Sequence, residues 1–460
     1  MPNLEVSPAP LSTQKIIRTW WPLAASWLLM SLETPTVSAI ISRLAHPEIS
    51  LASYGGVVFP LALLIESPII MLLAASTALS KDWDSYLKIK SFMMRASACL
   101  TALHTLIAFT PLYYFVVVNL IGAPPQIVEP ARLGFMVMVP WTWSIAYRRF
   151  HQGVLIRFGH SREVGIGTIV RLISIFTVAM TGYWIGSIAG AIVAAAGVTA
   201  GVIGEAIYIG IRVQPVLRNQ VRNAPRVETP VTLKNFLHFY VPLAMTSLLV
   251  LLVQPIGSAA LSRMPNALPS LAVWPVLAGL VFLVRSMGLA YNEVAVALLD
   301  EPHSLESLRR FAKLLTLYTT IPLALIAATP LAQLWFEGVV GLAPSLAALA
   351  YIGLWIALPL PALSVWQNWF QGLIVHSRQT RGITESVVIF LIFSNVILWA
   401  GVAWSQMTGA YVAQIATVVG SAVQVAWLWK RSRSVLETVK KREAATVVRE
   451  KEKISVGSLP

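Results

Sequence analysis

Twelve apolar runs, each long enough to cross a membrane, constrain the fold of this chain more than any other feature of its sequence. A bilayer core requires about 20 apolar residues per helix. The runs cover roughly residues 19–43, 51–79, 92–121, 129–152, 164–185, 187–211, 236–262, 269–297, 312–336, 344–370, 383–404 and 408–430. Only 12% of the residues are charged, against about 25% in soluble domains. We therefore predict an all-α membrane protein with about 12 transmembrane helices.

Lysine and arginine residues are concentrated in alternate loops between these runs. One set of loops and both tails hold most of the basic residues, whereas the opposite set has little beyond Arg43, Arg132 and Arg263. Because basic loops stay in the cytoplasm, we expect a multi-pass cell-membrane protein with both termini cytoplasmic. Arg148 and Arg149 are interpreted as part of this topogenic set. The formal net charge of +14 then reflects topology, and no nucleic-acid partner is expected.

The two halves of the sequence resemble each other. Residues 22–43 align without gaps over 242–263, and 11 of the 22 positions are identical, including Pro35 and Pro255. The segment that separates the two copies contains six predicted helices. Because six is an even number, both halves enter the membrane in the same direction. Parallel repeats of this kind occur in transporters, where one half rocks against the other around a central site. We therefore predict two six-helix bundles enclosing a cleft.

The charge pattern and the repeat together divide the chain. The predicted parts are a cytoplasmic N-terminal segment (1–18), an N-terminal bundle (19–211), a basic cytoplasmic linker (212–235), a C-terminal bundle (236–430) and a basic cytoplasmic tail (431–460). No phosphate-binding loop, HExxH or CxxC motif is present, and the single cysteine is Cys99. We therefore expect no enzymatic activity, no catalytic residues, no cofactor and no metal site.

Several charged residues fall inside the apolar runs, where an ionised side chain is costly and usually functional. Glu33, Glu66 and Arg285 lie near mid-membrane, and Arg171 lies within the fifth run. The repeat places Glu66 at the level of Arg285 on the opposite bundle. One hypothesis is that these two side chains pair when the cleft closes; the alternative is that each charge is paired within its own bundle for structural reasons.

Glu33 and Glu66 share the local pattern Glu-x-Pro, "ETP" and "ESP". A proline frees a backbone carbonyl one turn earlier and bends the helix, so the carboxylate and the freed carbonyl suit a proton or Na⁺. The alternative is a protonated glutamate bonded to a neighbouring helix. The full candidate set for substrate or ion binding is Glu33, Glu66, Arg171, Gln254, Arg263, Arg285, Asn292 and Glu293. Arg43 and Arg263 are interpreted as interface anchors or as a basic rim for anions.

Several short segments resemble the progressive ankylosis (ANK) family of transporters. They are "LASYG" (51–55), "HTLIA" (104–108), "LYYFVVVNL" (112–120), "QPIGSAALSR" (254–263) and "PLPALSVWQNWFQGLIV" (359–375). The resemblance places the chain in the exporter superfamily that includes multidrug and toxin extruders (MATE proteins) and oligosaccharide-lipid flippases, called MOP. It implies a V-shaped, MATE-like pair of bundles and export of anions such as citrate, nucleotide phosphates or pyrophosphate. Of the charged candidates, Glu33 and Arg263 are the ones that fall on matching motifs.

Four functions remain open: three kinds of transport and a role as a non-transporting membrane scaffold. The first is export of small organic or phosphorylated anions, which requires Arg171 and Arg285 to be exposed in the cleft. The second is Na⁺- or H⁺-coupled multidrug efflux, which requires Glu33 and Glu66 to be exposed and unpaired. A lipid-linked precursor flippase and a non-transporting membrane scaffold are the others. The expected partners are a small-molecule substrate, a coupling Na⁺ or H⁺ and the lipid bilayer, and the expected state is a monomer.

Overall fold

The computed structural model describes residues 11–227, 231–377 and 381–457, and within these ranges every regular element is helical. The first half contains α1 (Thr13–Ser31), α2 (Glu33–Ile41), α3 (Pro47–Ser53), η1 (Tyr54–Val58), α4 (Phe59–Ile70), α5 (Leu72–Leu79), α6 (Trp83–Phe109), α7 (Leu112–Tyr114), η2 (Phe115–Ile121), α8 (Pro125–Val137), α9 (Val139–Arg157), α10 (Ser161–Ile185), α11 (Gly190–Val216) and η3 (Leu217–Val221). The second half contains α12 (Leu233–Leu261), α13 (Ala267–Leu289), α14 (Tyr291–Leu298), α15 (Ser304–Ala328), α16 (Leu331–Gln333), η4 (Leu334–Val340), α17 (Pro344–Ala357), α18 (Leu360–His376), α19 (Arg381–Trp404) and α20 (Gly409–Gly457).

Most of the predicted membrane runs are present as long apolar helices. Ten spans in the described residues are long and apolar enough to cross a membrane, or 11 if α17 and α18, which meet at 41°, form one broken span. The predicted run 129–152 corresponds to α8 and α9, which are not among these spans. Arginines on α9 lower its hydropathy, but α9 packs against α5, α6 and α11. Neighbouring helices, rather than lipid, therefore surround much of its polar surface.

The same order of elements recurs in both halves. In each half a short π-helical segment, η2 or η4, follows the third long helix and ends at a glycine with positive φ. These glycines are Gly122, with φ 74°, and Gly341, with φ 84°. Glycine adopts this left-handed conformation without steric cost and is therefore common directly after a helix.

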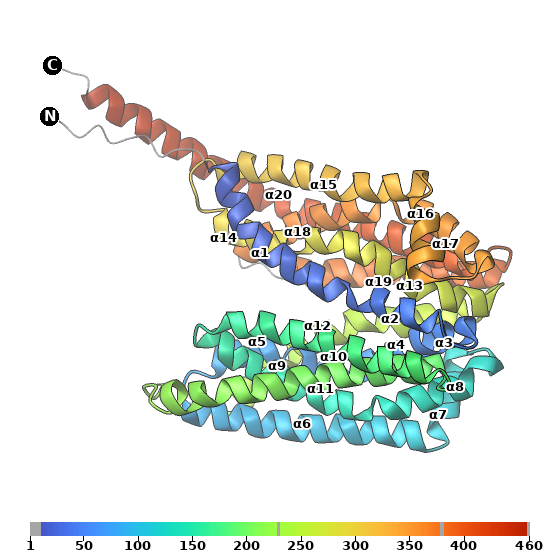
Figure 1. The fold of residues 1–460 in the computed structure, drawn as a ribbon. Coiled ribbons are helices and arrows are strands. Elements are labelled where there is room, and N and C mark those ends of the chain that lie inside the picture. Colours follow the sequence, from blue (N-terminus) through green and yellow to red (C-terminus); the bar gives the residue numbers. More distant parts are fainter. Residues whose placement is uncertain (1–10, 228–230, 378–380, 458–460) are drawn as a thin grey trace.

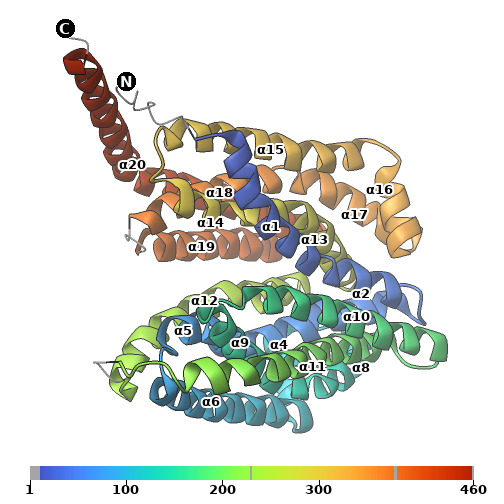
Figure 2. The ribbon, with the colours of Figure 1, turned by 60° about the vertical axis from the view of Figure 1, so that its left-hand side comes forward.

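The first helix of each half packs largely on the other half. Figures 1 and 2 show α1 lying against the group that contains α13–α20, and α12 lying with the group that contains α4–α11. The indole Nε1 of Trp20 on α1 donates to the carbonyl of Met287 on α13 at 3.0 Å. The hydroxyl of Tyr240 on α12 donates to the carbonyl of Pro68 on α4. Each bundle therefore receives the first part of one long span from the other half of the sequence. The ends of these spans, α2 and the residues around Met264, pack again on their own half.

The remaining close contacts between the halves lie away from the termini, at what we call the far end of the molecule (right in Figure 1). Here α3 and η1 pack against the first part of α13. The approach is close: a Cβ added at Gly56 would lie 3.2 Å from Cβ of Leu271. The guanidinium groups of Arg43 and Arg263 also cross between the halves at this end. The far end is therefore closed in this conformation.

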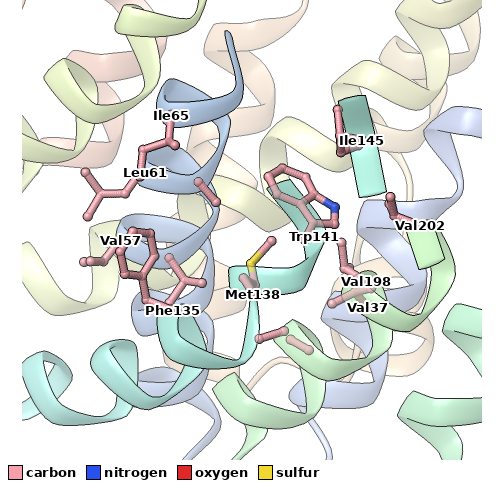
Figure 3. Packing of buried hydrophobic residues seen from close by; sticks show 14 of the residues in the cluster. Val37, Val57, Leu61, Ile65, Phe135, Met138, Trp141, Ile145, Val198 and Val202 are labelled. Atoms are coloured by element: carbon pink, nitrogen blue, oxygen red, sulfur yellow. The ribbon is translucent and has the colours of Figure 1, made fainter. Parts of the chain in front are cut away.

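A buried apolar cluster fixes the helices of the first half around α9. Figure 3 shows Val37 from α2, Leu61 and Ile65 from α4, Trp141 and Ile145 from α9, with further residues of the cluster around them. All of the labelled residues in Figure 3 are buried. Close packing of this kind fixes helix positions. It therefore fixes the depth of the polar residues on the next turn of α9.

Candidate functional site

A buried polar network lies between α9 and α11. Arg148 Nη1 is 2.6 Å from Glu205 Oε2, and Gln152 Nε2 donates to Glu205 Oε1 at 2.8 Å. Arg148 and Gln152 are four residues apart and therefore lie on one face of α9. All three side chains are buried, and Glu205 is 0% exposed. A carboxylate at this depth remains ionised only with such partners.

Arg171 on α10 extends this network to α2. Its Nη2 lies 3.1 Å from Glu33 Oε2, and its Nε lies 3.7 Å from Glu205 Oε2. Gly201 allows the approach, because a Cβ there would lie 3.1 Å from Cγ of Arg171 and 2.4 Å from Cγ1 of Ile175. Glu33, Arg171, Glu205 and Arg148 form one chain of alternating charges, which we call the four-charge network. Its two carboxylates balance its two guanidinium groups.

Glu33 stands at a break in the first membrane span. α1 ends at Ser31 and α2 begins at Glu33, with Leu32 between them in a non-regular turn. Leu32 keeps right-handed helical angles, with φ −70° and ψ −19°, and Thr13–Ile41 forms one membrane-length span. The ion pair with Arg171 accounts for an acid so far from either end of the run.

Glu66 and Arg285 are not brought together. Glu66 on α4 is 3% exposed, its Oε2 has no hydrogen bond, and no ion pair joins it to another described residue. Arg285 on α13 is half-buried, and its Nε likewise lacks a partner within the described chain. The proposed pairing is therefore not formed in this conformation and remains a prediction for another one. The alternative, pairing of Glu66 and Arg285 each within its own bundle, is not formed either among the described residues.

The other predicted site residues are scattered. Asn292 on α14 is half-buried with its Oδ1 unbonded, and its neighbour Glu293 is exposed. Gln254 on α12 is exposed as well. Arg263 binds backbone carbonyls of the opposite half at the far end. Of the eight candidates, only Glu33 and Arg171 contact each other directly through an ion pair among the described residues.

Arg148 was interpreted as topogenic, and this interpretation is wrong. Its side chain is 5% exposed and paired with Glu205 inside the bundle. A sequence signal was available: Arg148 and Gln152 repeat at helical spacing within a run that also contains Trp141 and Phe150. Arg149, its neighbour, is half-buried and its Nε has no partner in the described residues. The described residues contain no group of three or more His, Cys, Asp or Glu side chains that could hold a metal ion.

The sequence matches no protein-family model and no curated protein. Solved structures, however, share the fold over nearly the whole chain. An inward-facing multidrug resistance MATE transporter of the MOP superfamily aligns with a TM-score of 0.69 at 15% identity, covering 91% of this chain and 99% of the other. The lipid II flippase MurJ, in an inward closed conformation, aligns at 0.69 and 14% identity, covering 95% and 93%. A MOP superfamily transporter from Pyrococcus furiosus, described by the reverse polarity of its binding pocket, aligns at 0.63 and 18% identity, covering 92% and 96%.

These alignments define the class of fold. The chain is an all-α membrane protein with the MATE fold, built from two halves of corresponding helices. The fold, rather than the sequence, links it to the MATE and MurJ transporters.

Proposed function

We propose that this protein is an alternating-access transporter of the MOP superfamily that exports small organic or phosphorylated anions. The fold supports transport, because the solved proteins that share it are transporters and a flippase. The more specific ANK-type assignment rests on the sequence segments quoted above. On this proposal the protein has no catalytic residues, and substrate movement follows from rocking of the two bundles.

The observation that favours an anionic substrate is the charge balance deep in the protein. Among the described residues, four arginines and three glutamates lie buried or half-buried within the helical core: Arg148, Arg149, Arg171, Arg285, Glu33, Glu66 and Glu205. One positive charge is left over. Two of the arginines, Arg149 and Arg285, have no carboxylate partner in the described residues, and Glu66 has no ion pair there. Arg285 is the unpaired arginine on the second-half side. An unpaired charge that is partly removed from water is costly, and an anionic substrate would offset that cost.

We assign coupling to the carboxylates of the first half. Glu33 is bound to Arg171, so protonation of Glu33 would release the guanidinium and alter the position of α2 relative to α10. Glu66 is buried with a free oxygen and is the second candidate for a proton or Na⁺. Coupling through either residue would link an ion gradient to a change in bundle position.

We place both termini in the cytoplasm of a cell-membrane protein, following the distribution of Lys and Arg. The two halves of the repeat are assigned to residues 19–211 and 236–430, joined by the basic linker 212–235 and followed by the tail 431–460. In this orientation the far end faces the outside. The closed far end then corresponds to an inward-facing or occluded state.

Multidrug efflux coupled to Na⁺ or H⁺ is the second candidate. Glu66 favours it, because a buried carboxylate without an ion-pair partner suits a cation. Glu33 does not favour it, because Arg171 already neutralises its charge. A lipid-linked precursor flippase remains the third possibility and shares its fold with MurJ.

Purified protein in liposomes tests the proposal. Labelled citrate, labelled ATP and ethidium are supplied in parallel under imposed pH or Na⁺ gradients, with empty liposomes as the blank. We expect flux of an anion that falls in Arg285→Gln. Flux of ethidium alone, abolished by Glu66→Gln and unaffected by Arg285→Gln, would replace anion export with drug efflux.

A further inference from the structure

Arg43 reaches from the first half to the end of η4 in the second half. Its Nη2 donates to the carbonyl of Gly338 at 2.7 Å, and its Nη1 donates to the carbonyl of Val340 at 3.0 Å. Nη1 also donates to the carbonyl of Ala39, one turn earlier on α2, at 2.6 Å. The last bond holds the guanidinium against its own helix while the other two cross between the halves.

Arg263 makes the same arrangement in the opposite direction. Its Nη1 donates to the carbonyl of Ile121 at 2.6 Å, and its Nη2 donates to the carbonyl of Leu120 at 2.9 Å, both at the end of η2 in the first half. Nη1 also donates to the carbonyl of Ala259, one turn earlier on α12, at 2.7 Å. The two arginines therefore exchange equivalent contacts across the molecule.

The glycines that end η2 and η4 complete each contact. A Cβ at Gly122 would lie 3.1 Å from Cζ of Arg263, and a Cβ at Gly341 would lie 3.1 Å from Nη1 of Arg43. Each guanidinium thus rests directly against a glycine with positive φ. The last carbonyls of a helix lack partners within the helix and carry its negative dipole end, so a guanidinium binds them well.

We propose that Arg43 and Arg263 form a reciprocal clasp that holds the far end closed. Both sets of contacts, that of Arg43 with η4 and that of Arg263 with η2, must break for the protein to open outward. All of the carbonyls that cross the halves belong to the helix ends η2 and η4, and separation of the bundles at this end breaks them together. The clasp depends on alternating access, the mechanism part of the proposed function, and not on the class of substrate. It assigns Arg263 to the outer closure rather than to substrate binding.

Both arginines are suited to a reversible closure. The planar guanidinium donates to two or three carbonyls at once, which a lysine ammonium cannot reproduce in the same geometry. Neither arginine has a carboxylate partner among the described side chains. The contacts are therefore charge-assisted but carry no buried ion pair. Arg43 is exposed and Arg263 half-buried, so water can replace the carbonyls when the clasp opens.

A disulfide across the halves measures this closure without any substrate. The natural cysteine, Cys99, is exposed and is first replaced by serine. Gly56→Cys and Leu271→Cys then place two Cβ atoms about 3.2 Å apart across the far end, a few tenths of an ångström under the range of about 3.5–4.5 Å in natural disulfides. The rate of disulfide formation under a mild oxidant, in membranes, reports the closed fraction.

We expect Arg43→Ala with Arg263→Ala to slow disulfide formation at least tenfold relative to the parent pair, corresponding to about 1.4 kcal/mol. Arg43→Lys with Arg263→Lys should give an intermediate rate and provides a variant that retains both charges. Arg132→Ala is the matched control. Arg132 lies at the same end, but its contacts to Tyr114 and the carbonyl of Ala108 stay within the first half.

Equal rates in the parent, the double alanine variant and Arg132→Ala would overturn the clasp. If the double alanine variant fails to fold, the double lysine variant decides the question by the same comparison. In the double alanine variant, a loss of anion flux with an unchanged rate of disulfide formation would count against the clasp and leave the transport proposal standing. A slowed disulfide rate in a protein that moves no anion would support the clasp and count against the assigned substrate.

Discussion

Arg171 Nη2 lies 3.1 Å from Glu33 Oε2, and this ion pair joins α10 to the start of α2 directly after the break at Leu32. The side chains are 9% and 15% exposed, so water screens them little. The pair also connects to Glu205 through the same guanidinium, at 3.7 Å. A change at Glu33 is therefore transmitted to the core of the first bundle through Arg171.

Removal of one partner of this pair should destabilise the protein. Glu33→Gln leaves Arg171 with only the longer contact to Glu205, and we expect a loss of about 3 kcal/mol, in the range for a broken buried ion pair. Glu33→Gln with Arg171→Gln should lose less than Arg171→Gln alone. Thermal unfolding in nanodiscs measures all three variants. Glu306→Gln is the control, because Glu306 and Arg310 are 86% and 74% exposed, and it should change stability by less than about 0.5 kcal/mol.

Removal of the Arg285 charge should reduce transport without reducing stability. Its guanidinium is half-buried without a carboxylate partner in the described chain, so Arg285→Gln should leave the melting temperature unchanged or raise it. Anion flux into liposomes should fall at least tenfold in the same variant. Arg285→Lys, which keeps the charge, should retain part of the flux. A large loss of stability in Arg285→Gln would show instead that the side chain has a structural role.

The two glycines at the ends of η2 and η4 should not tolerate a side chain. Gly122→Ala and Gly341→Ala each force an alanine into the left-handed region, at a cost of about 1–2 kcal/mol. Each also places a Cβ 3.1 Å from an arginine guanidinium. Gly338→Ala is the matched control, because a Cβ there would meet only Leu334 Cδ1 at 3.3 Å. Thermal unfolding should separate the two glycines from this control, and equal melting temperatures would contradict the argument.

The carboxylate of Asp300 should hold the part of α20 around Arg442 against the rest of the protein. Its carboxylate lies 3.0 Å from His376 Nε2 and 2.5 Å from Arg442 Nη1. Hydrogen bonds from His376 and Arg442 hold the pKa of Asp300 below its ordinary value. The contact is therefore fully present above the unfolded pKa of about 3.9 and is lost as the pH falls through the lower folded pKa. Asp300→Asn should accelerate limited proteolysis within α20 at pH 7, whereas in the parent protein acceleration should require a pH below about 4.

The sequence predicted the membrane class and the internal repeat because both depend on local properties. Apolar runs of about 20 residues form helices wherever they enter a bilayer, since unpaired backbone groups cannot remain in hydrocarbon. The repeat of residues 22–43 in 242–263 likewise appears as equivalent elements in both halves. Glu33 stood out for the same reason, because a carboxylate within an apolar run is unusual at any position.

The pairing of those charges could not be predicted in this way. Arg148 reads as a basic residue near the end of a run, and only its position between α9 and α11 makes it the partner of Glu205. Glu66 and Arg285 share a depth in the repeat but do not meet in this conformation. The contacts of Arg43 and Arg263 lie 297 and 142 residues away in the chain.

The sequence alone therefore determined that this protein spans a membrane, that its two halves correspond, and that it carries a few ionisable groups at depth. The tertiary structure decided which of these groups neutralise one another, which remain unpaired, and how α1 and α12 exchange between the bundles. The physical reason is that hydropathy and helix formation are properties of a segment. An ion pair or a hydrogen bond, in contrast, depends on a separation of a few ångströms between residues that only the packing of distant helices brings together.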